Sequence, residues 1–372
     1  MRRFCENAVL SGRAPYDQMM KLHFTPNIAP GKIRENLFRL IIPGKICDGD
    51  MQSRIKRLGS RFGVYASTCP FGLWAPGLAI TGEMRAVTEC YLPLAEINSA
   101  WNRFLSLSLR YAATMTGTAI RTADCWLDVL QRLHPYVFRS DPAELLRRLL
   151  EDEDFRIGFL FALFLPGRHG GGFRRYPGQI EFLRRWLEKE NYHGKRVLRC
   201  LDAACATGES TYDLVLLLLE NGLSSESFLV HGSTIEPLEL FSAAHVFFPH
   251  ASDRQQTFLC RTAPVFAGGA CESMAFFTED IRLPCTQNSD RYDIILCNGL
   301  LGGPQFPSAD RITTAVSALR TRLHDGGIIL CADHFHGGWK KLAPPSLLTE
   351  VFTQCGFSVR EIADGLVAEK HQ

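Results

Sequence analysis

The chain has 372 residues, of which 46% are hydrophobic and 22% are charged, and its formal net charge at pH 7 is +2. This length predicts two domains, or one α/β domain with a helical extension. The composition is that of a globular protein, which excludes the disordered and fibrous classes. The near-neutral charge gives no reason to expect nucleic acid as a partner.

The cysteines and the apolar segments bear on the cellular compartment. The chain has 13 cysteines, and no two of them have Cys-x-x-Cys spacing. We therefore expect reduced, buried thiols, not metal ligands or disulfides. The longest apolar run, Ile157–Leu165, is too short to cross a bilayer, and the basic N-terminus lacks the apolar region of a secretion signal. These features predict a cytoplasmic protein without membrane insertion.

Residues 1–85 are basic and rich in Gly and Pro. Residues 1–61 contain twelve Lys and Arg against five acids. Segments such as TPNIAPGK and CPFGLWAPG interrupt any long periodic pattern, so this part is expected to be irregular and is assigned no fold. Its basic charge fits a solvated face, or an arm that contacts an anionic partner.

Residues 86–165 show apolar positions at intervals of three and four, which predicts a helical layer. Asp141-Pro142 has the residue types of an N-cap and first helical position. A Gly/Arg-rich connection and an amphipathic helix follow over residues 166–195. Such a connection is typical of a domain boundary.

From residue 196 to 372 the chain alternates strand and helix patterns. This alternation predicts an α/β domain, with a parallel sheet and helices on both faces, preceded by the helical region. The expected strands cover residues 196–204, 227–236, 274–280, 290–299 and 328–335, and the expected helices cover 210–222, 237–248, 309–327 and 347–357. Asp325-Gly326-Gly327 is expected to end the third of these helices.

The strongest motif is LDAACATGE at residues 201–209, where a strand runs into a small-residue turn and a helix. Small residues let a ligand lie against the strand end, and the helix N-terminus presents free N–H groups. A dinucleotide site would carry Gly-x-Gly-x-x-Gly, whereas this turn has one glycine and an acid, Glu209. An acid suits a cationic amino group, such as that of S-adenosylmethionine. An ordinary tight turn is the alternative.

Polar residues follow the next strands at the same edge. Glu236 stands where an acid accepts hydrogen bonds from ribose hydroxyls. Asp280 would accept from the adenine amino group while Ile281 lies on the ring. Asn298, after the fourth strand, would border the acceptor pocket. Each of these side chains could instead be an ordinary polar residue at a strand end.

No catalytic residue is assigned from the sequence. His334 and His336 follow the fifth strand and could act as a base, as could Tyr212. A two-residue spacing without a third ligand gives no basis for a metal site, and none is expected. A hydroxyl or amine acceptor would benefit from a base, whereas a carboxylate would not need a strong one.

Together these residues resemble the chemotaxis receptor-glutamate methyltransferase family. That family has Ser/Ala-Thr-Gly-Glu-Glu-Pro-Tyr-Ser where this chain has ATGESTYD at residues 206–213, so the Thr-Gly-Glu core and Tyr212 are kept. Upstream, Gly172-Phe173-Arg174 is similar to the family's Phe-Phe-Arg segment. The resemblance spans roughly residues 160 to 360 and implies a Rossmann-like methyltransferase sheet that binds S-adenosylmethionine.

The resemblance also implies roles for individual residues. Arg174 would hold the carboxylate of the donor, and Glu209 its amino group. Glu236 would bind the ribose, and Asp280 with Ile281 the adenine. The remaining donor-site residues are Asp202, Ala204, Thr207 and Gly208, at the strand end and turn of the motif, and Asn298 after the fourth strand, where the transferred methyl would lie.

Two departures from the family bear on the acceptor. After the fourth strand the family has Cys-Arg-Asn and then Tyr-Phe, whereas this chain has Cys297-Asn298-Gly299. The stretch between Glu236 and Phe276, where the family inserts a receptor-docking sheet, is short. We therefore expect methyl transfer to an acceptor other than a chemoreceptor, either a protein carboxylate or a small molecule. A non-catalytic S-adenosylmethionine-binding sensor or scaffold is the alternative from another class.

Overall fold

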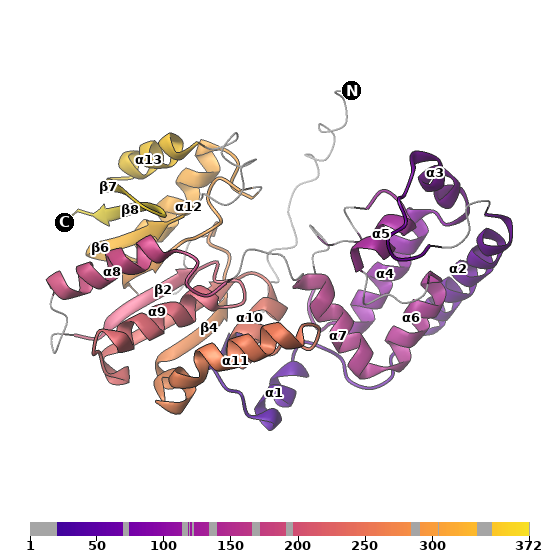
Figure 1. Ribbon diagram of the computed structural model, residues 1–372, viewed down its shortest axis with the longest axis horizontal. Coiled ribbons are helices and arrows are strands. Elements are labelled where there is room, and N and C mark those ends of the chain that lie inside the picture. Colours follow the sequence, from indigo (N-terminus) through magenta and orange to yellow (C-terminus); the bar gives the residue numbers. More distant parts are fainter. Residues whose placement is uncertain are drawn as a thin grey trace.

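The computed structural model contains a layer of helices beside an α/β domain (Figure 1). It describes residues 21–69, 74–113, 118, 120, 123–133, 140–165, 172–190, 196–283, 291–303, 305–332 and 344–371. We call helices α2 to α7 the helical layer, and we call residues 177–190 and 196–371, together with the strand that residues 23–24 add to their sheet, the sheet domain. Helix α7 packs against α10 of the sheet domain, so the two parts are in contact.

The helical layer includes residues that the sequence predicts to be irregular. Its helices are α2 (Gly49–Thr68), α3 (Gly82–Tyr91), α4 (Leu94–Ser108), α5 (Trp126–Leu133), α6 (Pro142–Glu151) and α7 (Glu153–Phe164). Helix α2 corrects that prediction. The Asp48 side chain caps α2 by accepting from the Met51 amide at 2.8 Å. Met51, Ile55, Leu58 and Tyr65 are buried at helical spacing, so α2 packs like the predicted helices.

Asp141 confirms the N-cap predicted for α6, because its side chain accepts from the Ala143 amide at 2.8 Å. Asp152 caps α7 in the same way through Phe155 at 3.0 Å. None of the helices in the described ranges is long and apolar enough to cross a membrane.

A fully buried arginine, Arg156 of α7, holds the helical layer to the preceding loop. Its Nη1 donates to the Leu149 carbonyl at 3.0 Å. Its Nη2 donates to the carbonyls of Ile42 at 3.0 Å and Gly44 at 2.7 Å. Burial lowers the pKa of the Arg156 guanidinium.

The sheet domain is built on eight strands in the order β1-β4-β3-β2-β5-β6-β8-β7. The strands are β1 (His23–Phe24), β2 (Leu198–Ala203), β3 (Phe228–Thr234), β4 (Met274–Thr278), β5 (Tyr292–Leu296), β6 (Leu323–Cys331), β7 (Phe357–Ile362) and β8 (Gly365–Lys370). Strands β2 to β6 are parallel, whereas β1 and β8 pair antiparallel with their neighbours. The predicted α/β fold with a preceding helical region is confirmed.

Two separate hydrophobic cores cover the two faces of the sheet. On one face, Cys200 and Val230 join a core that continues into the helical layer. On the other face, Leu201 and Ile295 join a second core with α12 and α13. Because side chains alternate along a strand, neighbours such as Cys200 and Leu201 point to opposite cores. The helices of this domain are α8 (Pro177–Glu190), α9 (Glu209–Glu220), α10 (Pro237–His245), α11 (Ser252–Ala267), α12 (Ala309–Thr321) and α13 (Pro345–Gln354).

The sheet domain differs from the predicted elements at three places. Helix α11 is not predicted from the sequence. Helix α12 ends at Thr321, and Leu323 already pairs with Tyr292 as part of β6. The register between β5 and β6 shifts at this point, so Gly326, with φ of +76°, accommodates a strand irregularity and does not end a helix. The C-terminal hairpin of β7 and β8 is also additional.

The first described residues are attached to the sheet domain. Strand β1 adds to the outer edge of β4, and α1 (Pro30–Leu37) follows it. His245, at the end of α10, contacts both Asn27 and Asn36. Its Nδ1 lies 2.6 Å from the Asn27 carbonyl oxygen, and its Nε2 lies 3.0 Å from Asn36 Nδ2. Several basic side chains of this part form ion pairs with acids: Lys32 with Glu35, Arg54 with Asp50, and Arg61 with Glu96. These pairs fit the solvated-face interpretation of its charge.

Candidate functional site

The turn between β2 and α9 has an unusual backbone. Ala204 and Ala206 have φ of +65° and +48°, and Gly208 has φ of +89°. Alanine in this region costs on the order of 1 kcal/mol, and such strain concentrates at functional sites. A Cβ at Gly208 would lie 2.9 Å from the Cβ of Ala243, so α10 packs closely under the turn. The sheet therefore holds this turn in a fixed, compact form.

Position in the sheet also points to this turn. Strand β2 lies between β3 and β5, and the chain order reverses there. In open α/β sheets, ligands bind at the carboxyl ends of the strands where the order reverses. The β2–α9 turn and Asn298, which follows β5, border this point.

Asp202 ties the end of β2 to the first turn of α9. It is buried, and its Oδ2 accepts from the hydroxyls of Ser210 and Thr211, both at 2.6 Å. Burial raises the pKa of Asp202 to about 6, while the two hydroxyl donors act in the opposite direction.

Glu209 forms an ion pair that the sequence does not reveal. Arg254 of α11 places its Nη2 atom 2.7 Å from Glu209 Oε1 and 2.6 Å from the Thr207 hydroxyl. Thr207 in turn donates to Glu209 Oε2 at 2.6 Å. The guanidinium also lies over the Phe248 ring, 4.6 Å from its centroid. The predicted amino-binding acid thus has a cation beside it.

Two acids lie near the end of β3. Glu236 caps α10 by accepting from the Leu238 amide at 3.3 Å, and it accepts from the Tyr111 hydroxyl at 3.1 Å. Glu239, one turn later, accepts from Thr234 at 2.9 Å. Burial raises the pKa of Glu236 to about 8 and that of Glu239 to about 7.

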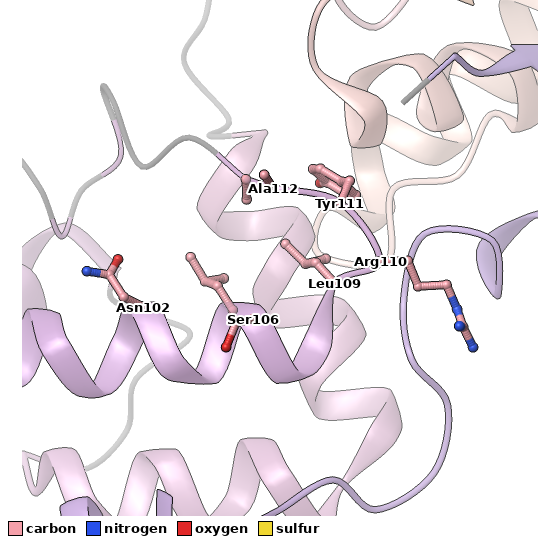
Figure 2. A pocket seen from close by; sticks show the side chains of 8 residues that line it. Asn102, Ser106, Leu109, Arg110, Tyr111 and Ala112 are labelled. Atoms are coloured by element: carbon pink, nitrogen blue, oxygen red, sulfur yellow. The ribbon is translucent and has the colours of Figure 1, made fainter. Parts of the chain in front are cut away.

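Tyr111 belongs to the segment after α4, so it joins the helical layer to the predicted ribose acid. Beside it lies a cavity of about 470 Å³, bordered by α4 residues and the segment from Leu109 to Ala113. Figure 2 shows Asn102 and Tyr111 at opposite ends of this group, with Ser106 and Leu109 between them and the Arg110 side chain directed away.

Asp280 and Ile281 follow β4 as the sequence predicts. Both are buried. Arg282 donates to both Asp280 carboxylate oxygens, with an Nε–Oδ1 distance of 2.8 Å. This arrangement resembles that of Glu209, because both of these predicted donor-binding acids pair with an arginine.

Asn298 is held on two sides. It exchanges two amide hydrogen bonds with Gln179 of α8, both of 2.9 Å, and its Oδ1 also accepts from the Ala332 amide at 2.9 Å. It therefore fixes α8 against the ends of β5 and β6, next to Gly299.

Two of the predicted residues lie away from the strand ends. The Arg174 guanidinium is 66% exposed and pairs with Glu220, the last residue of α9, at 3.3 Å. Tyr212 is fully buried, and its hydroxyl donates to the Ala243 carbonyl at 2.9 Å. Burial raises the pKa of Tyr212, so its hydroxyl serves the core instead of an acceptor site. His334 and His336 lie outside the described residues.

The site is rich in acids. Asp202 lies near the end of β2, and Glu209, Glu236, Glu239 and Asp280 lie in or just after the turns that follow β2, β3 and β4. Such a group favours a ligand with positive charge and several hydrogen-bond donors. Within the described ranges, no group of three His, Cys, Asp or Glu side chains is placed to hold a metal ion.

Three residues of this site are missed in the sequence. Arg254 and Glu239 lie on helices without a motif, and Tyr111 is 125 positions from Glu236. Glu239 carries a weak signal, since it follows the strand-end Thr234 and Glu236 by one helical turn. For Arg254 and Tyr111 the sequence has none.

In sequence, the chain is similar to a known methyltransferase. No protein-family model matches the chain. The chain is 25% identical over 193 residues to the probable biofilm formation methyltransferase WspC of Pseudomonas putida. This match covers 49% of the chain and 44% of that protein, so the chain spans less than half of its relative. The predicted resemblance to methyltransferases is confirmed at this level.

Solved structures similar to the chain are also methyltransferases. One is a SAM-dependent methyltransferase from Methanosarcina mazei, with 12% identity, a TM-score of 0.32, and coverage of 50% of this chain and 97% of that one. Another is magnesium protoporphyrin IX methyltransferase from Synechocystis with bound SAM, with 16% identity, a TM-score of 0.30, and coverage of 52% and 78%.

Proposed function

We propose that the chain binds S-adenosylmethionine at the carboxyl ends of β2, β3 and β4 and transfers its methyl group. One observation carries the proposal: Glu209, Glu236 and Asp280 follow three adjacent strands, in the order β2, β3, β4. That order matches the amino-acid part, ribose and adenine of the donor, laid across the sheet. The methyltransferase relative supports the same activity.

The side chains would each contact a different part of the donor. Glu209 would accept from the amino group, Glu236 from the ribose hydroxyls, and Asp280 from the adenine amino group, with Ile281 against the ring. The Ala204–Gly208 turn would let the donor lie close to the end of β2. Binding of the donor would require Arg254 and Arg282 to share their acids with it.

The chemistry proposed is an in-line displacement in which a nucleophilic atom of the acceptor bonds to the methyl carbon while the bond from that carbon to the sulfonium sulfur breaks. S-adenosylhomocysteine is the leaving group, and the positive charge on sulfur already makes it a good one. The protein would align acceptor and donor and exclude water. Asn298 and Gly299 would border the acceptor, held in place by Gln179. The acceptor proposed is a protein carboxylate or a small molecule, and a carboxylate would need no strong base.

Calorimetric titration with S-adenosylhomocysteine tests the donor site. We expect wild type to bind, and Asp280→Ala and Glu236→Ala to weaken binding by about tenfold or more, because Asp280→Ala loses a charge-assisted hydrogen bond to adenine and Glu236→Ala loses the hydrogen bonds to the ribose hydroxyls. Glu226→Ala is the matched control, since Glu226 precedes β3 at the opposite end of the sheet. A folded wild-type protein that does not bind would overturn the proposal.

Turnover distinguishes transfer from sensing. The protein is incubated with methyl-labelled donor and fractionated cell extract. Label in a protein or small-molecule fraction, abolished by Asp280→Ala, supports methyl transfer. Tight donor binding without transfer to any fraction would support a sensor or scaffold instead.

A further inference from the structure

We infer that Arg254 of α11, and not Arg174, binds the carboxylate of the donor and makes the site specific for ligands with an intact amino-acid group. This inference rests on the proposed function and names a residue that positions the donor. Arg254 is the cation closest to Glu209 among the described ion pairs, with 2.7 Å between Nη2 and Oε1.

The charges of the Glu209–Arg254 pair are complementary to an amino acid. The amino-acid part of the donor is a zwitterion, with an ammonium and a carboxylate on one carbon atom. An ammonium matches Glu209, and a carboxylate matches a guanidinium, which can donate two parallel hydrogen bonds. In the structure these two protein groups satisfy each other. A zwitterion inserted between them would satisfy both without leaving a buried charge unpaired.

Arg254 is held where it could serve this role. It lies in the first turn of α11, and its side chain is 23% exposed, whereas Glu209 is 7% exposed. Stacking over Phe248 and the hydrogen bond to Thr207 would keep the guanidinium in place when Glu209 turns to the ligand. The positive end of the α11 dipole adds to the attraction for a carboxylate.

The position of Arg174 argues against it as the carboxylate ligand. Its partner Glu220 is the last residue of α9, whereas Glu209 is the first. At 1.5 Å per residue the two acids are separated by roughly 16 Å along the helix axis. The Arg174 backbone amide donates to Asp213, which fixes the chain at this point. Arg174 therefore anchors the segment before α8 and lies away from Glu209.

Three ligands separate the contributions of the carboxylate and the amino group. S-adenosylhomocysteine has both groups, S-adenosyl-3-thiopropylamine has only the amino group, and 5′-methylthioadenosine has neither. Affinities are measured by calorimetry for wild type, Arg254→Ala, Arg254→Lys and the control Arg174→Ala. Thermal unfolding of each variant shows whether it is folded.

For Arg254→Ala we expect a loss of tenfold or more in affinity for S-adenosylhomocysteine, because a charge-assisted pair is lost. Affinity for 5′-methylthioadenosine should stay within about threefold. S-adenosyl-3-thiopropylamine should bind Arg254→Ala at least as tightly as it binds wild type, since Glu209 no longer has a competing cation in the variant. Arg254→Lys should recover part of the loss, and Arg174→Ala should leave all three affinities unchanged.

Several outcomes would overturn the inference. An equal loss for all three ligands in Arg254→Ala would mean that Arg254 only shapes the site. A selective loss of S-adenosylhomocysteine binding in Arg174→Ala would return the role to that residue. If wild type binds S-adenosylhomocysteine and 5′-methylthioadenosine equally well, the donor site stands but the carboxylate contact is wrong. If wild type binds neither, the proposed function fails as well.

Discussion

The helical layer and the sheet domain both bury charged groups, but they satisfy them differently. Arg156 of the helical layer donates to three backbone carbonyls in a closed part of the core. The acids of the sheet domain lie at strand ends and receive hydrogen bonds mainly from side chains, as Asp202 does from two hydroxyls. A buried charge that donates to backbone carbonyls serves the fold, whereas acids gathered at the strand ends and held by side chains can exchange those partners for a ligand.

Substitution of Arg156 by alanine tests the structural half of this comparison. It removes a fully buried side chain and its hydrogen bonds to the carbonyls of Leu149, Ile42 and Gly44, and it opens a cavity, so we expect Arg156→Ala to lower the free energy of unfolding by ~3–5 kcal/mol. Urea denaturation followed by circular dichroism measures this change. Arg148→Ala, on the exposed side of α6, is the control and should change stability by less than ~0.5 kcal/mol. An equally mild effect of both variants would show that Arg156 is not structural.

The acids of the strand edge predict a pH dependence of stability. Burial raises the pKa of Glu236 from 4.5 to about 8 and that of Glu239 to about 7. The folded protein thus holds protons that the unfolded chain loses above pH 4.5. The stability that these two carboxyl groups contribute is therefore fully present below pH 4.5 and is lost as pH rises to about 8. Glu236→Gln should reduce this fall by on the order of 2–4 kcal/mol.

Urea denaturation at pH 5, 6, 7 and 8 measures how steeply the free energy of unfolding falls with pH in wild type and in Glu236→Gln. Glu226→Gln, at an exposed site before the first residue of β3, should keep the pH dependence of wild type. Parallel curves for wild type and Glu236→Gln would contradict the burial of this carboxyl group.

The hydrogen bond from Tyr111 to Glu236 is one of the contacts between the helical layer and the sheet domain. Tyr111→Phe removes it, with an expected loss of about 1 kcal/mol. Because the hydroxyl lowers the pKa of Glu236, its removal should also move the fall in stability to higher pH. Tyr65→Phe loses a hydroxyl contact to Thr88 within the helical layer, at 3.3 Å, and should not move the pH profile. Identical pH profiles for both variants would mean that Tyr111 does not influence the site.

The alternation of strands and helices predicts most of the sheet domain because its buried strands are short apolar runs. Helix α11 has no comparable pattern in the sequence, since it buries few side chains, among them Phe258 and Val265, and contains Pro264. Residues Leu323 to Gly327 continue a helical pattern in sequence but pair with β5 in space. Tertiary pairing overrides local preference in such segments.

The site could be predicted where its residues follow one another closely. The β2–α9 turn is recognisable because small residues and a glycine are needed at adjacent positions. Arg254 reaches Glu209 from 45 positions away, and only packing of α11 against α9 brings them together. The sequence therefore offers Arg174 for the carboxylate, because Gly172-Phe173-Arg174 is similar to the family's Phe-Phe-Arg segment, and gives no sign of Arg254.

Strand β1 consists of two residues, yet it covers the free edge of β4. An uncovered edge strand can pair with another molecule, which is a route to aggregation. The amide of Leu22 bonds to Thr278, 256 positions later in the chain. During synthesis this N-terminal segment must therefore wait for most of the protein before it can pair. When β4 emerges, the segment that covers its edge is already present on the same chain, so the edge can be closed as soon as it forms.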